Sequence, residues 1–203
     1  MRKPKVREIK EALTALFKGP YTVPFPKVIH TPFPGFRGAP EFHPGDCVGC
    51  GACAMVCPTG TIELKDEVSE DGKKGKRILT LYYQNCEFCG FCEESCITGK
   101  GVRLSQDFDL ATFDRRSVFT RVEKDLALCE ICGKPVTAWE HLRWLSDKLG
   151  YLAYTNPQII VATHLNLLEI QKKAPRQKVI WRFDQMRILC PQHRREVYRV
   201  EER

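Results

Sequence analysis

Two cysteine-rich runs with the same spacing contain the residues of this 203-residue chain that are best suited to chemistry. The runs are Cys47-Val-Gly-Cys50-Gly-Ala-Cys53-Ala-Met-Val-Cys57 and Cys86-Glu-Phe-Cys89-Gly-Phe-Cys92-Glu-Glu-Ser-Cys96. Both follow the pattern C-x-x-C-x-x-C-x-x-x-C, which is the spacing of bacterial ferredoxins that bind [4Fe–4S] clusters through thiolates. The sequence therefore predicts two [4Fe–4S] clusters.

The fourth cysteine of each run is predicted to bind the cluster of the other run. Three cysteines two residues apart wrap around one cluster, and the fourth starts a helix that points away from it. The first cluster is expected to be held by Cys47, Cys50, Cys53 and Cys96. The second cluster is expected to be held by Cys57, Cys86, Cys89 and Cys92. Ile97 stands where the first run has Pro58, but neither residue is a ligand.

Structural zinc knuckles are the alternative for these two runs. A zinc ion takes four ligands in two C-x-x-C pairs, which leaves the third cysteine of each run unused. The repeat also extends beyond the cysteines, because Thr59-Gly60 follows the first run as Thr98-Gly99 follows the second. A duplicated unit of this kind favours the cluster interpretation.

Composition predicts a protein of a reducing compartment without a membrane-spanning segment. The eleven cysteines have the spacing of metal ligands, and the basic start lacks the apolar stretch of a signal peptide. No run approaches the ~18 apolar residues of a spanning helix. The formal charge of +7 is expected to reflect solvated lysines and arginines rather than binding of nucleic acid.

The first expected segment, residues 1–45, comprises an N-terminal helix and a docking arm. An amphipathic helix is predicted over residues 1–20, ending at Gly19-Pro20. Its apolar positions recur at helical spacing and are Val6, Ile9, Leu13, Leu16 and Phe17. This helix packs either on the cluster domain or on a partner or membrane surface. The many prolines of residues 20–45 predict an extended arm that does not pair into a sheet.

A ferredoxin-like domain of the α+β class is expected over residues 46–104. Strands are predicted at 61–65 and 77–82, between the two cysteine runs, with a charged turn joining them. Metal replaces much of the hydrophobic core in a domain of this size. Residues 105–128 are expected to form a connection out of this core.

The C-terminal extension, residues 129–203, is predicted to be helical and to bind zinc. Cys129-Glu-Ile-Cys132-Gly is typical of a zinc-knuckle turn, and Cys190-Pro-Gln-His193 can complete a closed tetrahedral site. One helix is expected from the capping box Thr137-Ala-Trp-Glu140 to Gly150, and a second from Asn156-Pro157 to near Pro175. The alternatives are an unmetallated site, a third cluster, or a redox pair formed by Cys129 and Cys132.

The whole pattern resembles a known family of electron-transfer subunits. The double run, the N-terminal helix, the Pro-rich arm and Phe36-Arg37-Gly38 are similar to the two-cluster ferredoxin subunit of respiratory complex I and of membrane-bound group 4 [NiFe]-hydrogenases. The tail narrows the resemblance to the electron-transfer subunit of formate hydrogenlyase, which also carries a cysteine-rich tail. The likeness covers residues 1–104 well and the tail loosely.

This resemblance implies a non-catalytic subunit that relays electrons. The implied partners are an electron-input iron–sulfur subunit, linked to formate dehydrogenase or ferredoxin, and hydrogenase-like large and small subunits, or the quinone module in complex I. The N-terminal helix would lie against a membrane-arm subunit, with the protein peripheral to the cytoplasmic face of the cell membrane. The eight cluster cysteines match the family, whereas a fourth cysteine can take the place of His193.

Two functions of other classes remain open. A free-standing ferredoxin carrier would not need residues 1–45 or a metal-bound tail. A nucleic-acid-binding protein with zinc and clusters would need a basic face with aromatic stacking. The weak hint of such a face is a set of tail arginines, Arg194, Arg195, Arg199 and Arg203.

Overall fold

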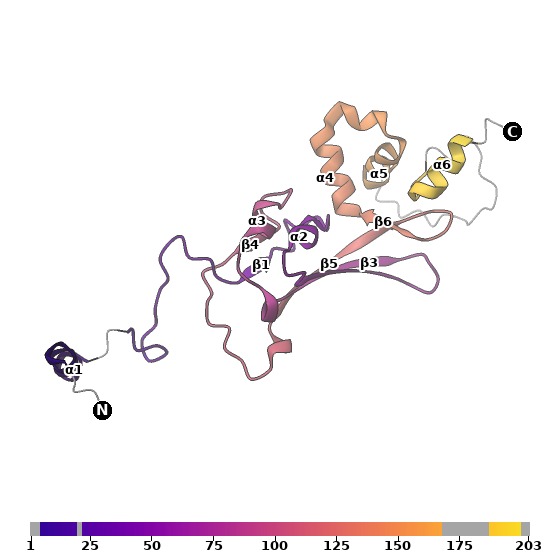
Figure 1. Ribbon diagram of the computed structural model, residues 1–203. Helices are drawn as coiled ribbons and strands as arrows, with labels where there is room; N and C mark the ends of the chain where they lie inside the picture. The colour runs from indigo at the N-terminus through magenta and orange to yellow at the C-terminus, as the bar shows by residue number, and fades with distance from the viewer. Residues whose placement is uncertain (1–4, 20–21, 168–186, 200–203) are drawn as a thin grey trace. The chain divides into compact units, whose positions relative to one another are not determined.

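The computed structural model describes residues 5–19, 22–167 and 187–199, and the chain divides into two compact units. The first unit is Met1–Phe36 and the second is Arg37–Arg203. Figure 1 shows the helices and strands of both units. Among the described residues, no helix combines the length and the apolar character that crossing a membrane requires.

The first unit contains helix α1, Val6–Lys18. Glu8 in its first turn and Lys18 in its last turn complement the helix dipole. The helix ends at Gly19, whose N–H donates to the carbonyl of Ala15 at 3.1 Å. None of its side chains is buried, and the apolar stripe of α1 is exposed.

The main sheet of the second unit has four antiparallel strands in the order β2-β3-β5-β6. These strands are β2 Ile62–Val68, β3 Gly75–Tyr82, β5 Phe119–Leu128 and β6 Pro135–Ala138. The hairpin of β2 and β3 is longer than predicted, because pairing continues into the charged turn as far as Val68 opposite Gly75.

The segment expected as a connection, 105–128, contains strand β5 in its second half. Val122, Lys124 and Leu126 are buried and alternate with exposed residues, as in a strand that packs on one face. The strand pairs with β3 from Phe119 opposite Tyr82 onward. Lys124 interrupts the apolar face, which weakens the periodicity by which a sequence indicates a strand. A short 3-10 helix, η2 Arg115–Ser117, precedes β5.

Short elements beside this sheet carry or flank the cysteine runs. These elements are α2 Ala52–Val56, η1 Tyr83–Asn85, α3 Phe91–Glu94 and a two-stranded sheet of β1 Pro40–Phe42 with β4 Val102–Leu104. The prediction that the Pro-rich arm stays out of a sheet is therefore wrong at its end, where Phe42 pairs with Val102. Pro40 is tolerated there because it begins an edge strand.

One small core joins the runs to the main sheet. Its buried members are Phe42, Cys47, Cys53, Ile62, Leu79, Leu81, Cys92, Val102 and Val122. Three of these nine are cysteines. The core is thus built partly from side chains that suit metal binding, as expected for a small ferredoxin-like domain.

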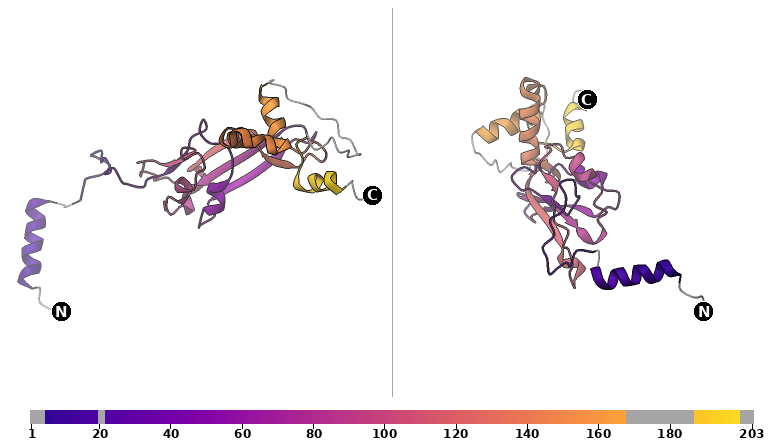
Figure 2. Two further views of the ribbon diagram at one scale, coloured as in Figure 1. Left: turned by 90° about the horizontal axis from the view of Figure 1, so that it is seen from above. Right: turned by 90° about the vertical axis from the view of Figure 1, so that its left-hand side faces the viewer.

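The C-terminal part packs helices against β5 and β6. Helix α4 Trp139–Leu149 leads through the 3-10 helix η3 Gly150–Thr155 into α5 Pro157–Leu167, and α6 Pro191–Arg199 follows. In Figures 1 and 2, α4 and α5 lie beside the end of the sheet that carries β6. A second core formed by Ala127, Leu142, Ala162 and Ile188 holds them there. The predicted continuation of α5 toward Pro175 lies outside the described residues.

The predicted capping box at the start of α4 is wrong. Ala138 is the N-cap, and no side chain caps the helix. The Thr137 hydroxyl instead pairs with Nδ1 of His141 at 2.9 Å, and Glu140 forms an ion pair with Lys124 at 2.5 Å. Both polar side chains are engaged in other contacts, which local sequence pattern does not reveal.

Candidate metal centres

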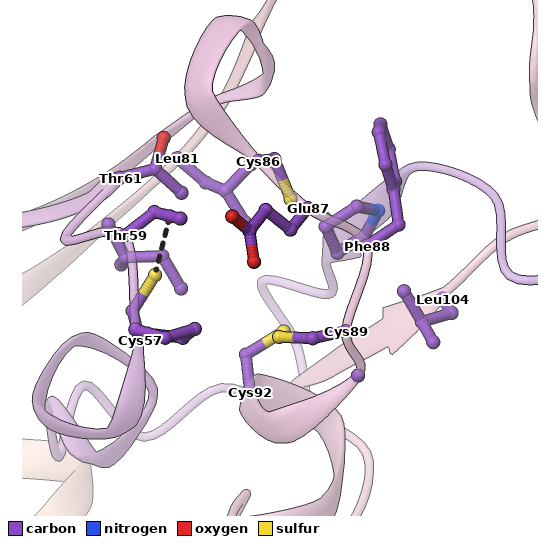
Figure 3. Close-up of a pocket in the computed structure, with 14 residues that line it drawn as sticks. Cys57, Thr59, Thr61, Leu81, Cys86, Glu87, Phe88, Cys89, Cys92 and Leu104 are labelled. Carbon is purple, nitrogen blue, oxygen red and sulfur yellow. Dashed lines mark hydrogen bonds between the residues drawn. The ribbon is translucent and has the colours of Figure 1, made fainter.

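Four cysteines from both runs line one pocket in the second unit, as Figure 3 shows. Cys57 follows the end of α2, and Cys86, Cys89 and Cys92 come from the second run. The apolar residues that line the same pocket are Pro40, Pro58, Ile62, Leu81, Phe88 and Leu104. Four thiol sulfurs around one space suit a [4Fe–4S] cluster, which needs four thiolates. This grouping is the one that the crossed pattern predicts for the second cluster.

The other four cysteines of the two runs are the ligands predicted for the first cluster. Burial raises the pKa of the Cys47 thiol most, and the nearby sulfurs of Cys50 and Cys96 raise it further. Gly101 lies between two of these residues, because a Cβ atom there would approach Cα of Cys47 to 3.0 Å and Sγ of Cys96 to 3.3 Å. Glycine permits this close approach. The structure thus brings Cys96 to the first run.

Burial also affects the thiols deepest in the two sites. It raises the pKa of Cys53 to about 12 and that of Cys92 to about 11, with smaller contributions from neighbouring cysteines. Both thiols are therefore protonated at neutral pH without a metal. Because metal ligands must be thiolates, cluster binding has to displace these protons.

Hydrogen bonds hold the sulfur of the fourth cysteine in each run. Sγ of Cys57 lies 3.6 Å from Oγ1 of Thr59, and Sγ of Cys96 lies 3.3 Å from Oγ1 of Thr98. Burial raises the pKa of both thiols, but the hydroxyls and backbone N–H groups that follow outweigh it and lower the pKa. Such donors stabilise thiolate sulfur and tune a bound cluster. In the sequence, this role is indicated by a threonine two residues after the fourth cysteine of each run.

Two buried cations lie beside the loop of the first run, and the cysteine pattern does not predict them. Nη1 of Arg77 on β3 donates to the carbonyl of Gly49 at 3.0 Å. Nζ of Lys124 on β5 donates to the carbonyl of Pro44 at 2.6 Å. In the sequence, each of these cations occupies a strand position that faces the core, where an apolar residue is usual.

The four predicted zinc ligands converge in the C-terminal part. Cys129 and Cys132 lie in the turn between β5 and β6, and Cys190 and His193 lie at the start of α6. Their ligand atoms lie within 4.8 Å of one another. Nδ1 of His193 is 3.5 Å from Sγ of Cys129 and 3.3 Å from Sγ of Cys190. Sγ of Cys132 is 3.8 Å from Sγ of Cys190.

These distances suit a tetrahedral zinc ion. Bonds of ~2.3 Å to sulfur and ~2.0 Å to nitrogen place two sulfurs roughly 3.8 Å apart, and a sulfur and a nitrogen roughly 3.5 Å apart. Protein contacts hold the two halves of the site together. The Glu130 carboxylate accepts from the backbone N–H of Ile188 at 3.0 Å, and the backbone N–H of Glu130 donates to the carbonyl of Ile188 at 3.0 Å.

Known proteins are similar to this chain in sequence. A family described as a 4Fe-4S dicluster domain matches residues 46–100. The chain is 29% identical over 116 residues to NADH-quinone oxidoreductase subunit I 2 of Geobacter metallireducens, covering 55% of this chain and 88% of the relative. It is 34% identical over 122 residues to NADH-quinone oxidoreductase subunit I 1 of Symbiobacterium thermophilum, covering 55% and 75%. It is 27% identical over 161 residues to formate hydrogenlyase subunit 6 of Escherichia coli, covering 79% and 83%.

Proposed function

Because this chain belongs to the NADH-quinone oxidoreductase subunit I family, we propose that it relays electrons through two [4Fe–4S] clusters within a membrane-associated respiratory or hydrogenase complex. The double cysteine site carries this proposal. Two observations support crossed ligands: Cys57 lines a pocket with three cysteines of the second run, and Cys96 lies close to Cys47 of the first run. A dicluster family also matches residues 46–100, which include all eight cysteines. When bound, such clusters transfer one electron at a time.

The chain itself would position and shield the clusters. Cys47, Cys50, Cys53 and Cys96 would hold the first cluster, and Cys57, Cys86, Cys89 and Cys92 the second. Burial of Cys47, Cys53 and Cys92 keeps water away from part of each site. The hydroxyls of Thr59 and Thr98 would stabilise the fourth thiolate of each cluster.

We assign a structural zinc ion to Cys129, Cys132, Cys190 and His193. Four protein ligands complete the coordination of zinc and leave no open position for a substrate. The ion would therefore stabilise the fold rather than take part in a reaction. It would fix the turn between β5 and β6 to the start of α6, and so support the helices that pack on that side of the sheet.

The proposed partners are an electron-input iron–sulfur subunit, hydrogenase-like large and small subunits, and a membrane-arm subunit. Similarity to a formate hydrogenlyase subunit supports a hydrogenase type of complex. The exposed stripe of α1 supports docking, because Val6 and Phe17 are each 84% exposed and burial of apolar surface contributes ~25 cal/mol per Å². This arrangement would place the protein on the cytoplasmic face of a membrane, without spanning it.

Anaerobic purification of the untagged native complex tests the proposal. We expect several subunits to co-purify. After anaerobic separation from them, this chain should contain about eight irons and give two magnetically interacting EPR signals on reduction. About four irons per chain would contradict the two-cluster proposal. Recovery of the chain alone, with about eight irons, would instead indicate a free-standing ferredoxin carrier.

A further inference from the structure

Arg77 and Lys124 are the buried cationic residues of the part of the chain that the structure describes. The register of β3 and β5 makes them direct partners, so both side chains lie on one face of the sheet. Both donate to carbonyl groups of the first cluster loop, which we define as residues 44–50. Like charges directly opposite each other in a sheet are destabilising. A benefit other than strand pairing is therefore needed to account for this pair.

Each of the two cations forms an ion pair with a carboxylate, but the two carboxylates differ in their exposure to solvent. Asp66 on β2 binds Arg77 through two bonds of 2.8 Å, and both side chains are largely buried. Glu140 on α4 binds Lys124 at 2.5 Å, but its side chain is 42% exposed while that of Lys124 is 7% exposed. Water screens the half-exposed carboxylate more than the buried ammonium. A net positive potential therefore remains around Lys124.

This potential lies next to the first cysteine site. Nζ of Lys124 donates to the carbonyl of Pro44, three residues before Cys47 in the same loop. A buried ammonium at this place stabilises negative charge at the first site. The aliphatic stem of the lysine also packs under the loop, because a Cβ atom on Gly49 would lie 3.1 Å from Cγ of Lys124.

The second cluster loop, residues 86–89, has a different electrostatic environment. Glu87 stands where the first loop has Val48, and its side chain lines the second pocket (Figure 3). Arg37 donates to the carbonyl of Cys89 at 3.1 Å, but it is exposed to solvent. Within the described residues, the buried cations thus lie beside the first loop, where the acidic residue Asp46 is exposed, whereas Glu87 lines the second pocket.

We propose that Lys124 makes the cluster at the first site the more easily reduced of the two, and that Glu140 of the C-terminal extension sets the size of this effect. The inference rests on the proposed function, since it requires a cluster at each site. Reduction adds one electron, supplied in the complex by the electron-input partner, and the added negative charge is stabilised by a nearby buried cation. The extension would then adjust electron transfer as well as support the fold.

Redox titration of the full-length, cluster-loaded protein, followed by EPR, tests this inference. Mediators reduced by dithionite supply the electrons, and the loss of a signal in Cys50→Ser identifies the first cluster. Lys124→Gln should move the midpoint potential of that cluster to more negative values, and Glu140→Gln should move it to more positive values. We expect about a tenfold change in the ratio of reduced to oxidised cluster at fixed potential, or about 59 mV. Lys124→Arg, which retains the charge, should stay close to the wild type.

Matched controls come from the opposite face of the same two strands. Lys76 and Glu123 each precede one of the paired cations and form an exposed ion pair at 3.0 Å. Lys76→Gln removes one positive charge, as Lys124→Gln does, and Glu123→Gln removes one negative charge, as Glu140→Gln does. Lys76 is the neighbour of Arg77 on β3, and Glu123 is the neighbour of Lys124 on β5. Both controls should leave the two midpoint potentials unchanged, because exposed charges are screened.

Iron content and thermal unfolding of each variant separate the possible outcomes. Wild-type protein with fewer than about eight irons would overturn the proposed function and this inference with it. Fully loaded variants whose first-cluster midpoints do not shift, or shift in the same direction, would overturn the tuning role and leave the proposed function intact. If Lys124→Gln does not load clusters, the half-exposed Glu140→Gln decides: a positive shift supports the inference, and no shift overturns it.

Discussion

A Cβ atom on Gly49 would lie 3.0 Å from Cβ of Ala138, so the first cluster loop rests directly on the residue before α4. Gly49 has φ of +68°, a conformation in which residues with a side chain are strained. Lys124 packs on the same glycine from β5. The C-terminal extension therefore forms part of the surface on which a cluster-binding loop is built.

Gly49→Ala should disturb this contact more than a comparable substitution elsewhere. The new methyl group meets Ala138 and Lys124 in addition to the strain of positive φ, which predicts a loss of roughly 2 kcal/mol or more in stability. Gly60→Ala is the control, because Gly60 has φ of +62° but no atom within 4 Å of a new Cβ, and should cost about 1 kcal/mol. Thermal unfolding and iron retention on anaerobic heating measure the difference. Equal losses in the two variants would contradict the contact.

The crossed grouping of cysteines predicts which cluster each fourth cysteine serves. Cys57→Ser should impair the cluster held with Cys86, Cys89 and Cys92, because Cys57 lines that pocket. Cys96→Ser should instead impair the cluster at the first run. EPR spectra of the two reduced variants, compared with iron content, distinguish the two signals. Selective loss of the cluster nearest in sequence would show that the ligands do not cross.

The zinc assignment predicts a separable loss of metal and stability. Cys190→Ser should release one zinc ion per chain and lower the unfolding temperature by about 5 °C or more, because metal binding is coupled to folding. Metal analysis should find the iron content unchanged. Gln192→Ser serves as the control and should retain zinc, because Gln192 is an exposed residue in the first turn of α6. Native protein without zinc, and without iron beyond that of two clusters, would refute the assignment.

Helix α1 is predicted to serve assembly rather than cluster binding. Removal of residues 1–36 should leave both clusters reducible, since these residues form a separate unit and Pro40–Phe42 keeps its pairing with β4. The shortened chain should fail to join the membrane complex, as judged by co-purification of the other subunits.

Substitutions within α1 refine this test. Leu13→Asp should impair assembly strongly, because the proposed contact is apolar. Lys10→Asp, which changes charge outside the apolar stripe, should have a smaller effect. Loss of the clusters on truncation would instead mean that α1 supports the ferredoxin-like domain, and the docking role would be wrong.

Strand β5 and the end of the Pro-rich arm are two strands that the sequence pattern does not predict. The charged Lys124 obscures the alternation of β5, and the prolines of residues 20–45 conceal that Pro40–Phe42 is an edge strand. In both cases a partner strand from a distant part of the chain determines the conformation. Glu140 shows the same principle, since its tertiary ion pair with Lys124 replaces the predicted helix cap, while Thr137 makes a local contact with His141.

The sequence by itself determined the iron–sulfur chemistry of the two runs, because ligand type and spacing within a few residues decide which metal a cysteine run suits. It also indicated the pairing of Cys129 and Cys132 with Cys190 and His193, since zinc demands four ligands. Only the tertiary structure decided the electrostatic surroundings of the first loop. Arg77 and Lys124 become neighbours through strand register, and Glu140 reaches Lys124 through the packing of α4. Register and packing depend on contacts between distant segments, which no local spacing encodes.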